Sequence, residues 1–308
     1  MRALITGSNG FVGKYLRAEL ERNGYDVTGL DVVEGEKTIR ADILDPKQML
    51  DVIETVRPDV IFHLAGQANV GASWKIPQKT VEINVVGAVN LAEAVRAVDP
   101  GIRMVWIGSS DQYGQLGAAG VNVSEDMQTA PQTPYAVSKA AQEAMAQVYV
   151  RAYGMKICMT RSFNHAGAGQ KKGFMIPDFA SGIADIERGR ADKLSVGNLT
   201  ARRDYTHVKD IVRAYRLIAE KGTPGTVYNV GSGRTWSARE ILDKLIALAD
   251  CPVTAEPDPN RMRPSETPVI CCDHSRLTRD TGWEAGIGID EILSEVLDEW
   301  RNKSDQEG

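Results

Sequence analysis

Five short apolar runs, each followed by a stretch of different periodicity, constrain the fold more than any other feature of this chain. The runs are RALIT (2–6), DVTGLD (26–31), DVIFHLA (59–65), RMVWIGS (103–109) and KICMTRS (156–162). Helical patterns lie between them, near residues 10–22, 46–56, 77–98 and 135–153. Strands that are apolar throughout are buried on both faces, and strict alternation with helices gives right-handed crossovers. The sequence therefore predicts an α/β fold with a doubly wound parallel sheet.

A smaller C-terminal lobe is predicted after Phe163, where the alternation loosens. The features there are a glycine-rich polar segment (164–174), a helix near 174–188, a strand near 227–233 and an irregular proline-rich stretch at 251–268. Such irregular stretches are typical of binding loops. We expect residues 1–163 to form the first domain, to which 205–231 returns, and residues 164–204 and 232–308 to form the smaller lobe.

A glycine array directly follows the first predicted strand. The segment TGSNGFVG places Gly7, Gly10 and Gly13 between the strand at 2–6 and the helix at 10–22. Glycines at such a turn let the backbone approach a pyrophosphate closely, and the helix amides can bind its oxygens. The array therefore predicts dinucleotide binding in the first domain, and a tight turn without a ligand is the alternative.

Asp31 ends the second predicted strand, where a carboxylate can accept hydrogen bonds from the adenosine ribose hydroxyls. A 2′-phosphate at that place would be repelled. The nearest basic residues, Lys37 and Arg40, do not follow Asp31 directly. This arrangement favours NAD(H) as the cofactor and leaves NADP(H) as the alternative. Asp31 could instead only cap a turn, without a role in cofactor binding.

Two Tyr-x-x-x-Lys pairs occur, Tyr135 with Lys139 and Tyr205 with Lys209. Only the first pair begins a helix after the strand that ends at Ser109, and carboxyl ends of parallel strands face the ligand crevice. A phenol is a poor acid at neutral pH unless a neighbouring ammonium lowers its pKa. We expect Tyr135 to transfer a proton, Lys139 to lower the Tyr135 pKa and hold the nicotinamide ribose, and Ser109 to bind the reacting oxygen. A half-buried Tyr beside a solvated Lys is the alternative.

Four motifs resemble those of the extended short-chain dehydrogenase/reductase family, in the same order. They are TGSNGFVG (6–13), HLAGQ (63–67), GSSDQYG (108–114) and YAVSK (135–139). The resemblance spans nearly the whole chain and implies a Rossmann domain and an oxidoreductase that acts on a nucleotide sugar. The further cofactor contacts that it implies are Asn9, Phe11, Val12, Asp42, Ile43, Leu64, Ala65 and Gly66.

Three segments of the second half resemble the GDP-mannose branch of that family. They are RSFNHAGAGQ (161–170), VGNLTARRDYTHVKD (196–210) and RMRPSE (261–266). The resemblance implies that Asn164 contacts the sugar or a phosphate, and that Arg203 and Arg263 bind the diphosphate or ribose, as arginine forks do. We expect Arg202 to form a surface ion pair instead. The remaining substrate contacts that the resemblance implies are Ser110, Val196, Asn198 and Glu266.

The branch contains a GDP-mannose 4,6-dehydratase and a GDP-4-keto-6-deoxymannose reductase that makes GDP-D-rhamnose. The dehydratase resembles a longer, NADP-preferring chain in which a Thr is followed two residues later by a Glu. Ser109 and Asp111 occupy those places here, and the shorter Asp111 carboxylate is placed differently. The resemblance therefore favours the reductase and gives Asp111 a secondary catalytic role. A dehydratase, a nucleotide-sugar 4-epimerase that uses the same Ser, Tyr and Lys, and a non-catalytic NAD(H)-binding regulator remain as alternatives.

Composition narrows the other classes of function. The net charge is -5, and no basic patch typical of a nucleic-acid-binding protein is evident in the sequence. The four histidines and four cysteines do not show the spacing typical of metal ligands. Such cysteines are typical of reduced thiols in a cytoplasmic protein. The opening segment MRALITGSNGF is a strand-like run without an apolar h-region, so we expect no signal peptide. No later apolar run reaches about 18 residues, so we expect no membrane span. The resemblance also implies a homodimer through the helices at 77–98 and 135–153.

Overall fold

The computed structural model of the chain describes residues 1–115, 122–259 and 269–303. Within these residues one sheet contains seven strands, which run β10-β6-β5-β4-β1-β2-β3 and are all parallel. The strands are β1 (Arg2–Thr6), β2 (Asp26–Asp31), β3 (Thr38–Arg40), β4 (Val60–His63), β5 (Arg103–Ser109), β6 (Lys156–Ser162) and β10 (Val227–Val230). The predicted doubly wound parallel sheet is confirmed, and the short edge strand β3 was not predicted.

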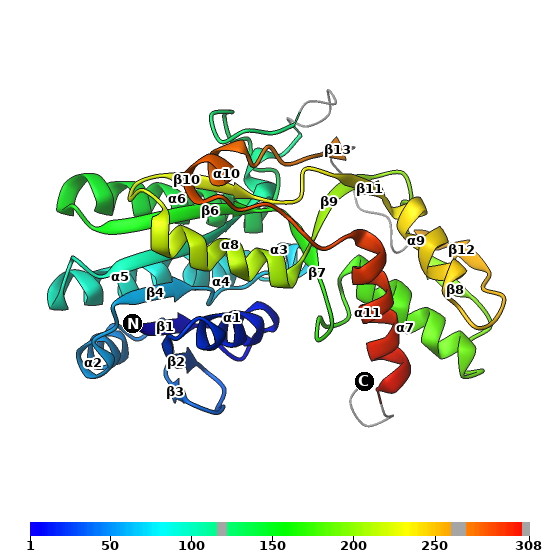
Figure 1. The fold of residues 1–308 in the computed structure, drawn as a ribbon, viewed down its shortest axis with the longest axis horizontal. Coiled ribbons are helices and arrows are strands. Elements are labelled where there is room, and N and C mark those ends of the chain that lie inside the picture. The colour runs from blue at the N-terminus through cyan, green and yellow to red at the C-terminus, as the bar shows by residue number, and fades with distance from the viewer. Residues whose placement is uncertain (116–121, 260–268, 304–308) are drawn as a thin grey trace.

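Two layers of helices cover this sheet (Figure 1). On one face lie α1 (Phe11–Arg22), α8 (Val208–Lys221) and α10 (Ser275–Thr281), and on the other α2 (Pro46–Val56), α5 (Gly87–Val98) and α6 (Pro134–Tyr153). Neighbouring strand residues alternate between the two cores: Leu4 packs toward α2 and α5, whereas Ile5 packs toward α1 and α8. Both faces are buried, which is why the strands are apolar throughout.

Helix α6 carries the predicted Tyr and Lys and has strong boundary signals in the sequence. The Thr133 hydroxyl accepts a hydrogen bond from the amide of Ala136 at 3.0 Å, and Pro134 occupies the first turn. Gly154 ends the helix at a φ of 65°, a conformation that favours glycine. The helix therefore begins beside the carboxyl edge of the sheet, and Tyr135 is its second residue.

The stretch 77–98, expected as one helix, is divided by a π-helical turn. It consists of α4 (Pro77–Val81), the π turn Glu82–Val86 and α5. The π turn buries Asn84, whose Oδ1 accepts from the amide of Gln67 at 2.7 Å and whose Nδ2 donates to Ser138 Oγ at 2.8 Å. Short α3 (Val70–Lys75) precedes this region and packs on α6.

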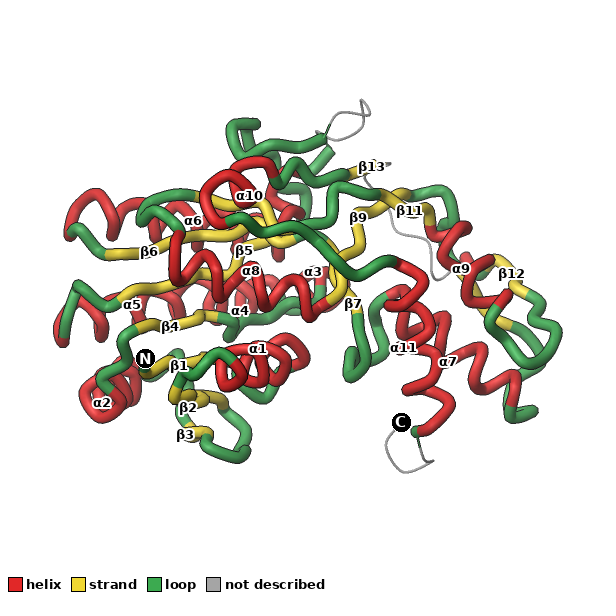
Figure 2. The backbone as a smooth tube through the Cα atoms, viewed as in Figure 1, coloured by secondary structure: helices red, strands yellow, loops and turns green. Residues whose placement is uncertain are grey.

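The second lobe has its own core and small sheets, and Figure 2 shows its short strands beside longer helices. The helices are α7 (Met175–Glu187), α9 (Ala238–Ala247) and α11 (Ile289–Asn302), and the strands are β7 (Asn164–Ala166), β8 (Leu194–Val196), β9 (Arg202–His207), β11 (Thr235–Ser237), β12 (Ala255–Pro257) and β13 (Val269–Ile270). Strand β9 pairs with β7, β11 and β13, and β8 pairs with β12. The sequence did not predict these short strands; β12 lies in the stretch expected to be irregular, and 260–268 lie outside the described residues.

The chain returns to the first lobe twice after it has entered the second. Helix α8 and β10 form the first return, and α10 with the segment that follows forms another. In that segment Trp283 is fully buried and donates from Nε1 to the carbonyl oxygen of Asp210 at 2.9 Å. Asp210 also accepts from the amides of Gly286 and Ile287, which fixes the path of the chain back to α11.

Candidate active site

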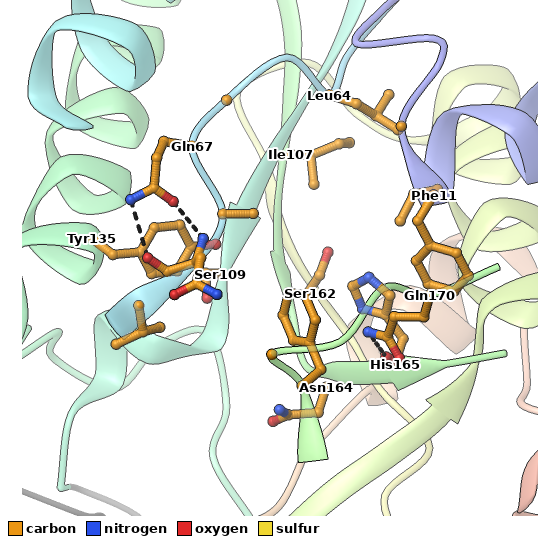
Figure 3. A pocket seen from close by; sticks show the side chains of 18 of the residues that line it. Phe11, Leu64, Gln67, Ile107, Ser109, Tyr135, Ser162, Asn164, His165 and Gln170 are labelled. Atoms are coloured by element: carbon orange, nitrogen blue, oxygen red, sulfur yellow. Dashed lines mark hydrogen bonds between the residues drawn. The ribbon is translucent and has the colours of Figure 1, made fainter. Parts of the chain in front are cut away.

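A cavity of about 1490 Å³ lies at the carboxyl ends of the parallel strands and extends between the two lobes. The first lobe supplies the turn after β1, the ends of β2, β4 and β5, and the start of α6. The second lobe supplies residues from Asn164 through Phe179 and from Gly197 through Tyr205. In Figure 3 Ser109 and Tyr135 lie on one side of this cavity, and Phe11, His165 and Gln170 lie on the other. This volume exceeds the roughly 300–1,000 Å³ that is usual for a pocket that holds one small ligand.

The turn between β1 and α1 is packed so closely that glycine positions in it cannot hold a larger side chain. Gly7 has a φ of +72°, and a Cβ on it would lie 2.8 Å from the Ala65 nitrogen. A Cβ on Gly13 would lie 2.5 Å from the Gly7 carbonyl oxygen. Gly10 precedes α1 and supplies no side-chain cap, so the first amides of α1 are available to an anion. These features fit the pyrophosphate of a dinucleotide.

The Asp31 carboxylate is fixed at the edge of the cavity by two main-chain amides. Its Oδ2 accepts from Asn9 at 3.0 Å and its Oδ1 from Val33 at 3.2 Å. Each oxygen can also accept a ribose hydroxyl, because a carboxylate has about four acceptor positions. The two nearby bases pair elsewhere, Lys37 with Glu21 at 3.5 Å and Arg40 with Glu34 at 3.6 Å.

Each of the other residues predicted to contact the cofactor also lines this cavity. They are Gly7, Asn9, Gly10, Phe11, Val12, Gly13, Asp42, Ile43, Leu64, Ala65, Gly66, Tyr135 and Lys139. Beneath them His63 is fully buried and shares a hydrogen bond of 2.8 Å between its Nδ1 and Thr6 Oγ1. Burial and the charge of Lys139 lower the pKa of His63 to about 3, so the imidazole is neutral.

Ser109 is the last residue of β5 and caps a single 3₁₀ turn, Ser110–Tyr113. Its Oγ accepts from the amide of Asp111 at 3.2 Å, and its own amide donates to Gln112 Oε1 at 3.2 Å. The preceding Gly108 is required by packing, since a Cβ there would lie 2.2 Å from the Thr160 carbonyl oxygen. Ser109, Ser110 and Asp111 all line the cavity.

Tyr135 and Lys139 lie one turn apart on α6, and both are buried, with 8% and 6% of their surface exposed. The Lys139 Nζ donates to the carbonyl oxygen of Ile107 at 2.8 Å and to Gln142 Oε1 at 2.9 Å. Burial lowers the pKa of Lys139 to about 8. Both predicted residues therefore reach the site, and the alternative of a solvated Lys139 is wrong.

The expected effect of Lys139 on the Tyr135 pKa is not found. Burial raises the pKa of the Tyr135 phenol, the charge of Asp111 raises it further, and the Ser109 hydroxyl offsets only part of this increase. The reason is that the ammonium of Lys139 is directed to Ile107 and Gln142, and its own charge is disfavoured by burial. At neutral pH the phenol therefore keeps its proton, as a proton donor requires.

The second lobe brings three of its four described substrate residues to the same cavity. Asn164, Asn198 and Arg203 line it. Val196, which was predicted to contact the substrate, does not line the cavity. Its residue surface is 1% exposed, and it packs in the core of the second lobe because it faces α7 from β8. Arg263 and Glu266 lie outside the described residues. Arg202 forms the expected ion pair, with Glu240 at 3.0 Å.

Several residues that sequence reasoning did not single out also line the cavity. The loop after β7 brings His165, which stacks on Phe11 with ring centroids 6.4 Å apart and planes 9° apart, and Gln170, which donates to the His165 carbonyl oxygen at 3.2 Å. Gln67 and Ser162 complete the group. The glycine-rich composition of 164–174 indicated a loop, but it carried no signal for which side chains would point inward.

Other kinds of site are not seen in the described ranges 1–115, 122–259 and 269–303. No group of three His, Cys, Asp or Glu side chains there is arranged to hold a metal ion. None of the helices in those ranges has both the length and the apolar content needed to cross a bilayer.

Comparison with known proteins decides the family. A family described as GDP-mannose 4,6 dehydratase matches residues 4–296. The chain belongs to the GDP-mannose 4,6-dehydratase family. It is 35% identical over 307 residues to a GDP-6-deoxy-D-mannose reductase from Pseudomonas aeruginosa, and the match covers 99% of both chains.

Solved structures agree with this family and with the predicted Rossmann fold. The structure of RMD from Pseudomonas aeruginosa complexed with NADPH matches with a TM-score of 0.89 and 34% identity, over 97% of this chain and 98% of that one. A UDP-glucose 4-epimerase from Thermus thermophilus in complex with NAD matches with a TM-score of 0.88 and 27% identity, over 99% and 100%. The resemblance to the GDP-mannose branch of the extended short-chain dehydrogenase/reductase family is thereby confirmed.

Proposed function

We propose that the protein reduces the C4 ketone of GDP-4-keto-6-deoxy-D-mannose to the alcohol of GDP-D-rhamnose, with NAD(P)H as the hydride donor. The observation that carries the proposal is the convergence of Ser109, Tyr135 and Lys139 on one cavity with the glycine turn. Full-length similarity to a GDP-6-deoxy-D-mannose reductase supports the choice of substrate within the family.

A bound nicotinamide cofactor would supply the hydride for the carbonyl carbon. Tyr135 donates its phenolic proton to the carbonyl oxygen, so that the ketone becomes an alcohol and the phenolate regains a proton from solvent. Ser109 donates a hydrogen bond to the same oxygen and orients it. Lys139, held by Ile107 and Gln142, would offer its ammonium to the nicotinamide ribose.

The side chains of the second lobe bind the GDP portion of the substrate in this proposal. Arg203 on β9 contacts the diphosphate or ribose, Asn164 on β7 contacts the sugar or a phosphate, and Asn198 contributes a further polar group. Guanidinium groups suit this task because their paired N–H donors match phosphate oxygens. Arg263 and Glu266 complete the substrate contacts that the family pattern implies.

The cofactor preference that we propose is for NADH over NADPH. Asp31 presents a carboxylate where a 2′-phosphate would lie, and Lys37 and Arg40 form ion pairs away from it. NADPH stays an alternative, because the Pseudomonas aeruginosa RMD structure is a complex with NADPH.

A dehydratase is the second candidate, and Asp111 is the observation that favours it. Its carboxylate lines the cavity, and its charge acts on Tyr135. An acid at this place is what elimination of water from GDP-mannose would use. The shorter reach of Asp compared with Glu argues for the reductase.

One assay separates the candidates. The purified protein is mixed with NADH, or separately with NADPH, and with GDP-4-keto-6-deoxymannose or GDP-mannose, and the absorbance of the reduced cofactor is followed. Oxidation of NADH with the keto sugar and not with GDP-mannose is the expected result. Conversion of GDP-mannose to a keto product would establish the dehydratase instead. A protein that purifies with stoichiometric NAD and consumes none would favour a 4-epimerase.

We also propose a cytoplasmic homodimer that pairs through the helices at 77–98 and 135–153. Exposed apolar residues on these helices support the interface: Val81, Val86, Val137 and Val148 are each more than 40% exposed. The four cysteines are free thiols, as suits a reducing compartment. Sedimentation at micromolar concentration should give a dimer, and a monomer would contradict the proposal.

A further inference from the structure

A continuous chain of hydrogen bonds joins Ser109 to helix α6. The Ser109 amide donates to Gln112 Oε1 at 3.2 Å, and Gln112 Nε2 donates to Glu143 Oε2 at 2.9 Å. Arg161 then holds Glu143 through two bonds, from Nε at 3.0 Å and from Nη2 at 2.7 Å. The end of β5 is therefore tied, through one side-chain amide, to the helix that carries Tyr135.

These groups are buried, which makes their pairing consequential. Gln112 is fully buried, Arg161 is 7% exposed, and the Glu143 side chain is 14% exposed. The Arg161 guanidinium also lies 4.8 Å from the ring centroid of Tyr113. A buried ion pair gives little net stability, but removal of one partner is strongly destabilising. The pair thus keeps Glu143 in one place and leaves one of its oxygens directed to Gln112.

Glu143 shares a helix face with the proposed proton donor. Tyr135, Lys139 and Glu143 follow one another at intervals of four residues, a spacing that places side chains on the same side of a helix. Arg161 on β6 is paired in register with Gly108 on β5, next to Ser109. The ion pair therefore bridges the helix of Tyr135 and the strand pair that ends at Ser109.

The direction of each hydrogen bond selects a glutamine at position 112. The Ser109 amide can only donate, and the Glu143 carboxylate can only accept, so the linking side chain must accept at one end and donate at the other. A glutamine amide does both in a single orientation. A carboxylate at this position would face Glu143 with like charge, and an apolar side chain would form neither bond.

We propose that Gln112 is a positioning residue that sets Ser109 relative to Tyr135, with Glu143 and Arg161 as its anchor. The inference rests on the proposed reductase activity, because it assigns Ser109 and Tyr135 to the same carbonyl oxygen. Gln112 does not line the cavity that would hold the cofactor and the substrate. It acts by fixing the amide of Ser109, and with it the turn that directs the Ser109 hydroxyl.

The test replaces Gln112 by Met, which keeps the length of the side chain and removes both hydrogen bonds. We expect kcat to fall about tenfold or more, while the KM for the keto sugar and the Kd for NADH stay within about twofold, since misplaced groups lose rate and not binding. The deuterium isotope effect with NADH labelled at the transferred position should be at least as large as in the wild type. Titration with NADH counts the folded sites, so that kcat is expressed per folded site.

Gln147→Met is the matched control, a glutamine on α6 four residues after Glu143. Gln147 Nε2 donates to the carbonyl oxygen of Gly225 at 3.0 Å, and neither side-chain contact that it makes involves Ser109. This variant should keep the wild-type kcat. Gln112→Leu gives a second shape if Met packs poorly.

The outcomes separate the two proposals. A wild-type protein that does not reduce the keto sugar defeats the reductase itself. A wild-type protein that does so, with an unchanged kcat per folded site in Gln112→Met and Gln112→Leu, overturns the positioning role. The same holds if both variants lose folded protein but retain full kcat per remaining site. An equal fall in Gln147→Met would show a general effect of lost hydrogen bonds and would also overturn it.

Discussion

The ammonium of Lys139 donates a hydrogen bond of 2.8 Å to the main-chain carbonyl oxygen of Ile107, two residues before Ser109. This bond ties α6 to β5 at the level of the proposed proton donor and its serine partner. Gln142 accepts a second hydrogen bond from the same nitrogen, and Lys139 is almost fully buried. Lys139 is therefore held in position by the protein itself.

Replacement of Tyr135 by Phe removes the proposed acid and keeps the ring. Turnover of the keto sugar should fall by about 100- to 10,000-fold, as is usual when a general acid is lost. Cofactor affinity should change little, because the phenyl ring still fills the same buried place. Steady-state rates and an NADH titration check the two parts, and a normal kcat in this variant would falsify the mechanism.

The buried Lys139 predicts a specific pH dependence of stability. Its folded-state pKa is lowered to about 8, whereas an unfolded lysine titrates near 10.4. Below pH 8 both states are protonated and the cost of burying the charge is present in full. Between about pH 8 and about pH 10 unfolding takes up a proton, so stability rises with pH in this window.

Lys139→Met isolates this effect, because the variant lacks the titrating group. The free energy of unfolding of the wild type, relative to the variant, should increase by about 2–3 kcal/mol between pH 7 and pH 10. Denaturant titrations at several pH values measure the difference. If this difference in the free energy of unfolding does not change between pH 7 and pH 10, the pKa of Lys139 is not lowered in the folded protein.

Gly13→Ala tests the glycine turn. The new Cβ would lie 2.5 Å from the Gly7 carbonyl oxygen and 2.6 Å from that of Ser8, so the turn must open. We expect a loss of about 1–3 kcal/mol in the free energy of unfolding and at least a tenfold weaker affinity for NADH. Gly286→Ala is the control, since its nearest neighbour would lie at 3.9 Å. Equal NADH affinity in both variants would contradict the assignment of this turn to the pyrophosphate.

Asp31→Asn tests the proposed preference for NADH. Removal of the negative charge should favour NADPH, and the ratio of kcat/KM for NADH to that for NADPH should fall about tenfold. Asp26→Asn changes the same charge at the opposite, exposed end of β2 and should leave the ratio unchanged. An unaltered ratio in Asp31→Asn would place cofactor discrimination elsewhere.

The buried strands of the first lobe, apart from the short edge strand β3, could be predicted because their sequence signals are local. The apolar runs and the glycine turn each depend on a few neighbouring residues, and both agree with the structure. The residues predicted to contact the cofactor line the cavity, and most of them were implied by the family resemblance of motifs that follow the strand ends.

The remaining features depend on contacts between distant segments. Nothing near Gln112 indicates that Glu143 and Arg161 will meet it, and the π turn that buries Asn84 adds no distinctive residue to a helical pattern. Val196 resembles a site residue in its motif, but its strand turns the side chain toward α7. The direction of the Tyr135 pKa shift also required the burial of the phenol, which spacing on a helix does not give.

The interleaved path of the chain has a consequence for engineering. Because α8, β10 and α10 belong to the first lobe while segments between β10 and α10 belong to the second, neither lobe is a continuous piece of the chain. A single cut would not release either lobe intact. Exchange of the substrate lobe with that of a relative would need several coordinated crossovers, and one graft point would leave Trp283 without the surface that encloses it.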